Sequence, residues 1–404
     1  MKKQSSYGWY VVLLNAVIGC VISTCFTQSS MTAGYLAAAM NVTRDAVLVG
    51  DTVKTVGIVL AMLLSGAAAQ KLGTRVVFSV SMGVVVVTLA VIPLNPSLPL
   101  LYILKFLQGF SGLMFPLLLV VNMESISARD RGLASAIFTG AFHGGAGVGG
   151  TVSSVIIERI SWQASFYVLA AVHLAVGVLW LLTVRLPENA QGAEKGREKL
   201  SFVSVLKNRT VWVLVAAYIA TIWCVQVITQ DMPLYSTYLG YSDLESGKLM
   251  SAISVGVIIA CLVSGKLSDS LAARRSDSAG TRLWVFAAGC AVTVLSIVVM
   301  LLADLRNFTL FYAVVMLFSF GASWGLGCFY CILPELLDQE TCAVATGFIG
   351  GCADFGMMLG PVFVGILLGS KGFWHLGWGL CAMIAAVSLF ACLGLIQSSH
   401  RKTT

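Results

Sequence analysis

Apolar runs of about 20 residues, separated by short polar loops, follow one another along almost the whole chain. A helix of about that length is needed to cross the hydrocarbon layer of a bilayer. The pattern predicts twelve membrane-spanning helices, at 8–30, 43–66, 75–95, 99–122, 132–157, 164–185, 210–235, 244–266, 282–303, 308–331, 342–369 and 374–397. The first run begins almost at Tyr7, and we expect it to be a span rather than a cleaved signal.

One long polar segment interrupts this series. It extends over residues 187–209 and is rich in Glu, Lys and Arg. We interpret it as a solvated linker between an N-terminal domain, 1–186, and a C-terminal domain, 210–404. The predicted fold is therefore an all-α membrane protein of twelve transmembrane helices, arranged as two pseudo-symmetric six-helix bundles.

Composition and charge narrow the class further. A chain that is 58% hydrophobic and 11% charged is no ordinary soluble domain. The net charge of +7 does not indicate nucleic-acid binding, because the basic residues lie in short loops between spans. Most of them fall in one alternate set of loops, which predicts cytoplasmic termini and a cytoplasmic linker. Cys328 and Cys331 have metal-like spacing but lie inside a span, so packing is the favoured interpretation, and we expect neither a metal nor a cofactor.

A loop signature occurs twice, once in each half of the chain. The first copy reads Gly66-Ala-Ala-Ala-Gln70-Lys71-Leu-Gly73-Thr-Arg75, and the second reads Gly265-Lys-Leu-Ser-Asp269. The glycine allows two helix ends to approach closely. The Asp or Gln can accept backbone N–H groups from the start of a neighbouring helix. The bases hold the loop at the cytoplasmic face.

These two loops resemble those between helices two and three, and eight and nine, of the major facilitator superfamily. Two repeated halves are also typical of secondary transporters with a site near the midplane. The resemblance implies gating roles for Gly66, Gln70, Arg75, Gly265 and Asp269. Gln70 stands where the family usually has Asp, which weakens a charge-based latch on that side.

Lys105 is the leading candidate for substrate binding. It lies in the fourth span, in Lys105-Phe-Leu-Gln108-Gly109, and an ionisable residue inside a span is costly unless it faces a partner or a cavity. In the resembling family an Arg stands at this point of a helix that lines the central cavity. Lys105 and Gln108 would then meet an anionic substrate. The alternative is a lysine that extends outward to the membrane surface.

Asp51 and Lys54 are three residues apart in the second span and share a helix face. They could form an internal ion pair that lowers the cost of inserting both. Alternatively, Lys54 joins Lys105 in making the first-half cavity positive, with Asp51 tuning it. Both interpretations stay open at this point.

His143 and Asp354 occupy equivalent positions of spans five and eleven when the halves are aligned. A histidine and a buried carboxylate suit a proton-linked switch, so His143, Asp354 and Asp51 are candidates for proton coupling. A purely structural role for His143 and Asp354 is equally open. His173 has no such counterpart and is interpreted as structural.

Neutral polar and aromatic residues could complete a substrate pocket: Gln28, Gln226, Gln230, Trp324 and Tyr330, with Asn15 beside them. Each could equally be a helix–helix contact.

The sequence predicts a secondary active transporter of a small organic anion, a carboxylate, working by alternating access in the bacterial inner or plasma membrane. It would be driven by a proton or a counter-anion, and it is no enzyme. The start at Tyr7-Gly-Trp9 is similar to bacterial monocarboxylate-transporter-like members. The alternatives are an exporter of amphipathic compounds and a non-transporting scaffold or sensor of the same fold. The partners expected are the anion, a proton or counter-anion and the lipid bilayer, with no nucleic acid.

Overall fold

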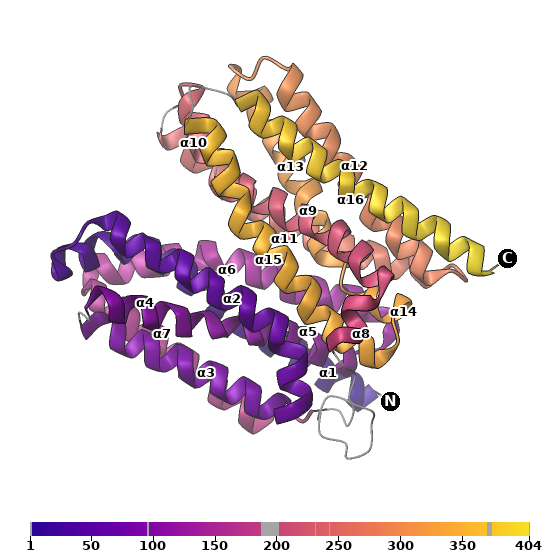
Figure 1. Cartoon of the computed structure of the whole chain (residues 1–404), viewed down its shortest axis with the longest axis horizontal. Coiled ribbons are helices and arrows are strands. Elements are labelled where there is room, and N and C mark those ends of the chain that lie inside the picture. Colours follow the sequence, from indigo (N-terminus) through magenta and orange to yellow (C-terminus); the bar gives the residue numbers. More distant parts are fainter. Residues whose placement is uncertain are drawn as a thin grey trace. The chain divides into compact units, whose positions relative to one another are not determined.

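The computed structural model describes residues 2–94, 97–186, 202–230, 232–241, 243–369 and 374–403. Within these ranges the chain is helical and has no strand. The helices are coloured along the chain in Figure 1. In chain order they are α1 (Lys2–Met40), α2 (Arg44–Leu72), α3 (Thr74–Val91), η1 (Ile92–Leu94), α4 (Leu98–Gln108), η2 (Gly109–Leu113), α5 (Met114–Ser125), η3 (Ala128–Asp130), α6 (Arg131–Arg159), α7 (Trp162–Thr183), α8 (Phe202–Lys207), α9 (Arg209–Gln230), α10 (Met232–Tyr238), α11 (Asp243–Ala272), α12 (Ser278–Leu302), α13 (Phe308–Cys328), α14 (Leu333–Leu336), α15 (Gln339–Gly369) and α16 (Trp374–Thr403).

Each of the twelve predicted spans coincides with a helix or with consecutive helical segments. Among the described residues, 10 helical stretches are long and apolar enough to cross a membrane. The other two predicted spans, 132–157 and 342–369, fall on α6 and α15, which are 29 and 31 residues long. The predicted linker, 187–209, lies outside the described residues as far as position 201.

The chain forms two compact units. The first comprises Met1–Ser127, Ala141–Phe202 and Ala343–Gly351, and the second comprises Ala128–Gly140, Val203–Cys342 and Cys352–Thr404. Helices α6 and α15 therefore contribute segments to both units. The domain limits drawn from the sequence stay a prediction.

Glycines allow a close helix contact in the first unit, between α2 and the turn that links α4 to α5. A Cβ added to Gly109 would lie 2.8 Å from the Cα of Gly57, and one added to Gly112 would lie 2.7 Å from the carbonyl oxygen of Ile58. Backbones approach this closely only where side chains are absent. The contact brings the polar positions of α2 next to those of α4.

A buried polar network lies elsewhere in the first unit. Asn15 Nδ2 donates to Asn122 Oδ1 (2.8 Å), and Trp180 Nε1 donates to Asn15 Oδ1 (2.7 Å). The ring of Trp180 stacks on Phe78 at 4.0 Å between centroids. Asn15 is buried and joins α1 to α5 and α7. Its place beside a substrate pocket stays a prediction.

Candidate functional site

Lys105 of α4 lies inside the first unit, with a side chain that is 2% exposed. Its Nζ donates to Ser29 Oγ of α1 and forms an ion pair with Asp51 Oδ1 of α2 at 3.0 Å. Ser29 Oγ in turn donates to Asp51 Oδ1 at 2.5 Å. Three helices are thus joined by one ion pair and one hydroxyl group, and Lys105 does not extend outward to the membrane surface.

Lys54 lies one helical turn beyond Asp51 and is also 2% exposed. Its Nζ donates to the carbonyl oxygen of Cys25 at 3.3 Å. We call Ser29, Asp51, Lys54 and Lys105 the lysine cluster. Its members carry two formal positive charges and one negative charge.

Exposure within the lysine cluster is uneven. The Asp51 side chain is 31% exposed, whereas both lysines are almost completely buried. The stem of Lys105 passes close to Gly50, where an added Cβ would lie 3.3 Å from Lys105 Cγ. Asp51 is therefore the most exposed charged group of the lysine cluster.

A cysteine and a histidine lie next to the cluster. Cys25 Sγ is 3.7 Å from His173 Nε2, and His173 Nδ1 is 2.7 Å from the carbonyl oxygen of Leu169. A carbonyl oxygen only accepts, so Nδ1 carries the proton and Nε2 is free to accept from the thiol. Both ring nitrogens of His173 have partners, as its structural interpretation predicts.

Sequence reasoning missed Ser29 and Cys25. They are four residues apart on α1 and so share a face of the helix, and that face meets α2 at Lys54 and Asp51. Their helical spacing is the one feature of the sequence that could have predicted their place beside the lysines. Small polar residues at that spacing are equally typical of helix packing, so the sequence does not distinguish the two roles.

The two other substrate candidates of the first unit are buried. Gln28 is 1% exposed and its Nε2 donates to Ser165 Oγ at 3.3 Å. Gln108, one turn after Lys105, is 3% exposed, and its Oε1 has no hydrogen-bond partner in the described part of the chain. A buried amide oxygen without a donor is costly, so Gln108 is the better candidate for a ligand contact.

The second unit holds the remaining substrate candidates. Gln226 of α9 is half-buried. Trp324 Nε1 donates to the carbonyl oxygen of Val285 at 2.8 Å, and Tyr330 packs edge-on against Tyr218 at 5.1 Å between centroids. The side chain of Gln230 lies outside the described residues.

The two symmetry-related candidates for proton coupling lie in different units. His143 of α6 belongs to the first unit and Asp354 of α15 to the second. Both side chains are half-buried. His143 packs edge-on against Phe142 at 5.4 Å between centroids.

The second copy of the loop signature forms a polar network within the second unit. Asp269 accepts hydrogen bonds from the backbone N–H groups of Gly132 (2.9 Å) and Leu133 (2.8 Å), in the first turn of α6. This is the cap that the signature predicts for its Asp. A Cβ on Gly265 would lie 2.5 Å from Ala136 Cβ, so the glycine is needed where α11 meets α6.

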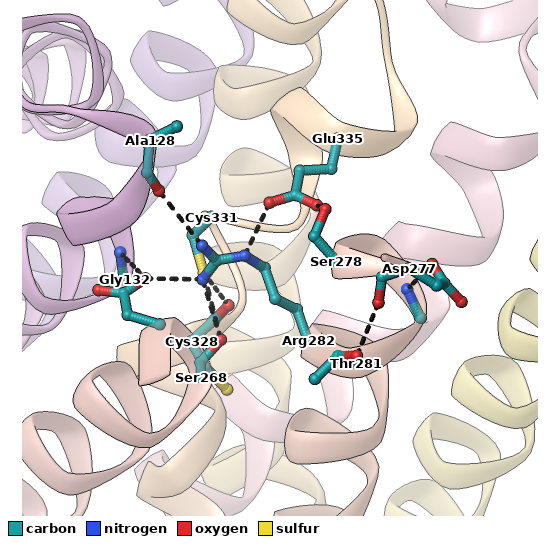
Figure 2. Close-up of polar contacts among 12 residues, drawn as sticks. Ala128, Gly132, Ser268, Asp277, Ser278, Thr281, Arg282, Cys328, Cys331 and Glu335 are labelled. Atoms are coloured by element: carbon teal, nitrogen blue, oxygen red, sulfur yellow. Dashed lines mark hydrogen bonds and ion pairs between the residues drawn. The ribbon is translucent and has the colours of Figure 1, made fainter. Parts of the chain in front are cut away.

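Arg282 of α12 is the centre of this network (Figure 2). Its Nη1 is 2.8 Å from Asp269 Oδ1, and its Nε is 2.8 Å from Glu335 Oε1. Nη2 also donates to the carbonyl oxygen of Ala128 at 3.4 Å. The Arg282 and Asp269 side chains are 3% and 4% exposed. The planar fork of Arg suits this role because it donates in several directions at once. Neither Arg282 nor Glu335 stands in a sequence pattern that predicts its place in this network.

The first copy of the signature is different. Gly66 is buried and Gln70 is half-buried near the end of α2. Arg75 Nη2 donates to the carbonyl oxygen of Val184 at 2.8 Å, which joins the start of α3 to the end of α7. Arg75 of the first copy therefore forms this hydrogen bond within the first unit.

Comparison with known proteins assigns the family. The model of the Major Facilitator Superfamily matches residues 11–276, more than half of the chain. The chain belongs to the major facilitator superfamily. It is accordingly an all-α, multi-pass membrane protein of the superfamily's two-bundle fold. Among the described residues, no group of three or more His, Cys, Asp or Glu side chains could hold a metal ion.

Solved members of the superfamily share the fold over nearly the whole chain. The human organic anion transporter MFSD10 (TETRAN) superposes with a TM-score of 0.70 at 14% identity, covering 95% of this chain and 99% of that one. The Escherichia coli fucose:proton symporter FucP gives 0.73 at 12% identity, covering 96% and 98%. At these identities the likeness concerns the fold alone.

Several curated superfamily relatives are described as anion transporters. "Probable anion transporter 6" of Oryza sativa subsp. japonica is 24% identical over 240 residues, which is 54% of this chain and 56% of that protein. Human "Sodium-dependent phosphate transport protein 1" is 23% identical over 250 residues, 55% and 52% of the two chains. The "Probable nitrate/nitrite antiporter NarK1" of Thermus thermophilus is 23% identical over 325 residues, 74% and 72%. The chain spans about half the length of the first two.

Proposed function

We propose that this superfamily member is a secondary active transporter of a small organic anion, of the carboxylate class, working by alternating access. The observation that carries the proposal is the buried lysine cluster of the first unit. Two lysines that are each 2% exposed lie there with one carboxylate. Burying two lysine side chains among membrane helices is costly, and ionisable residues at such depth commonly serve a ligand or an ion pathway.

Charge and hydrogen bonding both favour an anion. At about 4 Å and an effective dielectric constant near 20, one unit charge attracts another by about 4 kcal/mol. Lys105 and Lys54 would supply this attraction. Gln108 Oε1, without a partner in the described residues, would accept from the protonated or hydroxyl-bearing part of the ligand. Gln28, Gln226, Gln230, Trp324 and Tyr330 are proposed as additional lining residues.

The names of the relatives support an anionic substrate. Their names include phosphate, nitrate and other anion transporters. The carboxylate remains our own choice within that class, since a carboxylate group matches two ammonium groups and an amide without a metal ion.

We propose that a proton or a counter-anion drives the transport, with Asp354, His143 and Asp51 as the candidate proton carriers. Counterflow in liposomes at equal pH on both sides separates the two modes: exchange needs only a second anion, whereas symport accumulates the anion when the outside is acidified. Asp269 and Gly265, with Gly66, Gln70 and Arg75 of the first copy, are proposed to gate the cytoplasmic side.

The proposed location is the cell's inner membrane, with both termini in the cytoplasm. The distribution of Lys and Arg between alternate loops supports this orientation. Cysteine-accessibility labelling at each terminus in intact cells and in opened vesicles tests it.

The direct test is ligand binding by the detergent-purified protein and its Lys105→Ala variant. A ligand that binds the native state raises the melting temperature with its concentration. We expect one class of carboxylates to stabilise the wild type and to lose at least about tenfold in affinity in the variant. Lys248→Ala, which removes an exposed lysine of α11, is the matched control and should bind normally. Stabilisation by hydrophobic cations alone would refute the proposal and favour an exporter of amphipathic compounds.

A further inference from the structure

A small internal space lies within the second unit, between α9, α12, α13 and α16. The four helices pack against one another around it, with α9 and α12 each in contact with both α13 and α16 (Figure 1). Half of the described lining residues are alanines and glycines, and the others are Thr221, Cys224, Cys290, Thr293 and Ser388. All five of these side chains are buried, and none of them belongs to the proposed anion site.

The size of the space fits one water molecule. The volume open to the centre of a water molecule is about 10 Å³, and a single buried water needs about 10–15 Å³ on this measure. A carboxylate ion has several non-hydrogen atoms and is too large for it. The space is therefore no second substrate pocket.

Two glycines of α13 leave the threonine hydroxyls of this space uncovered. A Cβ added to Gly321 would lie 2.9 Å from Thr293 Oγ1, and one added to Gly325 would lie 3.0 Å from Thr221 Oγ1. Both distances are too short for a methyl group beside an oxygen, so alanine at either position would press on a hydroxyl. The space thus depends on the absence of side chains on this face of α13.

The hydroxyl groups that line the space have acceptor capacity left over. Thr293 Oγ1 donates its proton to the carbonyl oxygen of Gly289 at 2.9 Å, and Ser388 Oγ donates its proton to the carbonyl oxygen of Ala217. Cys290 Sγ is 3.3 Å from Ser388 Oγ, and since the serine proton is already used, the thiol is the donor in that contact. A hydroxyl oxygen has two lone pairs, so Thr293 and Ser388 each retain at least one.

These groups match the hydrogen-bonding needs of water. A buried water usually makes about three hydrogen bonds. Here its two protons would go to Thr293 Oγ1 and Ser388 Oγ, and its oxygen would accept from the hydroxyl of Thr221. A metal cation such as Ca²⁺ needs more oxygen ligands and usually a carboxylate, and the described lining residues include no carboxylate. An apolar occupant would leave the hydroxyl oxygens unsolvated.

We infer that the second unit binds a single water molecule, which bridges Thr221 of α9, Thr293 of α12 and Ser388 of α16. The water joins three helices that have no backbone hydrogen bonds to one another within a membrane-spanning bundle. Its place does not depend on the anion site, so the inference goes beyond the proposed function and can fail or stand without it.

The direct test is an experimental structure of the wild type, of Thr293→Val and of Ser388→Ala, at a resolution that shows other buried waters. We expect density for one water within hydrogen-bond distance of Thr293 Oγ1 and Ser388 Oγ in the wild type, and its loss in at least one variant. An empty space in the wild type would overturn the inference. A water that keeps its position in both variants would overturn the assigned partners.

A double-variant cycle in thermal unfolding tests the bridge independently. Thr293→Val and Ser388→Ala should each lower the melting temperature by about 2–4 °C. Their combination should lower it by less than the sum, because both substitutions remove bonds to the same water. Thr229→Val is the matched control: its hydroxyl also donates to carbonyl groups of its own helix, α9, but does not line the space. Combined with Ser388→Ala it should be additive, and equal additivity in both pairs would refute a shared water.

Discussion

Arg282 is expected to be one of the most sensitive positions of the second unit. Replacing it by Met keeps much of the side-chain volume but removes the cation from between Asp269 and Glu335. Asp269 is 4% exposed and would keep its two backbone donors from α6 while losing its counter-charge. Breaking a buried ion pair by removing one partner costs about 3–5 kcal/mol.

Glu335 adds little to this cost, because its side chain is 21% exposed and water can solvate it. A loss of about 3–4 kcal/mol in a unit of this size corresponds to about 5–15 °C in melting temperature. The assay is thermal unfolding of the detergent-purified protein, followed by intrinsic tryptophan fluorescence. Arg282→Lys should lose less, because one ammonium group keeps the charge but cannot form both ion pairs in the same geometry.

A double variant tests the reasoning itself. Asp269→Asn in the Arg282→Met background removes the uncompensated buried charge, so the double variant should melt higher than Arg282→Met alone. Such coupling is the expected sign of two side chains in direct contact. An Arg282→Met protein that melts within about 2 °C of the wild type, or a double variant that melts lower still, would refute the account of this network.

Two further substitutions test packing. Gly265→Ala places a Cβ 2.5 Å from that of Ala136 and should lower the free energy of unfolding by about 1–3 kcal/mol. The control, Gly83→Ala, has nothing within 4 Å of the added Cβ and should melt like the wild type. Equal melting temperatures for the two variants would show that the contact between Gly265 and Ala136 does not constrain the fold. Asn15→Leu leaves the indole N–H of Trp180 without the acceptor that it has in the wild type. A buried donor without an acceptor lowers the free energy of unfolding by about 1–3 kcal/mol. An unchanged melting temperature would mean that the hydrogen bonds of Asn15 do not stabilise the first unit.

The sequence determined the transmembrane architecture because lipid leaves a chain few choices. A span in hydrocarbon must satisfy all its backbone groups internally, so an apolar run of sufficient length forms a helix whatever its neighbours are. All twelve predicted spans coincide with helical segments for this reason. The repeated loop signature likewise predicted the kind of partner that Asp269 finds, since a carboxylate beside a helix start accepts backbone N–H groups.

The partners themselves were decided by tertiary structure. Spacing along α2 drew attention to a pair between Asp51 and Lys54, but the carboxylate binds Lys105, 54 positions away on α4. That choice depends on how closely α2 approaches α4, which in turn depends on Gly57 and Gly109. The spacing of residues along a helix predicts which of them share a face of that helix. It does not predict which face of another helix they contact.

The same limit applies to the hub of the second unit. Arg282 could be recognised in the sequence as a basic residue at the start of a span, and nothing more. Its contacts with Asp269, Glu335 and Ala128 come from segments that are 13, 53 and 154 positions away. The sequence by itself determined that charges would be few and placed at helix ends or inside spans. Folding decided which of them neutralise one another, because ion pairing acts over a few ångströms in space and is indifferent to distance along the chain.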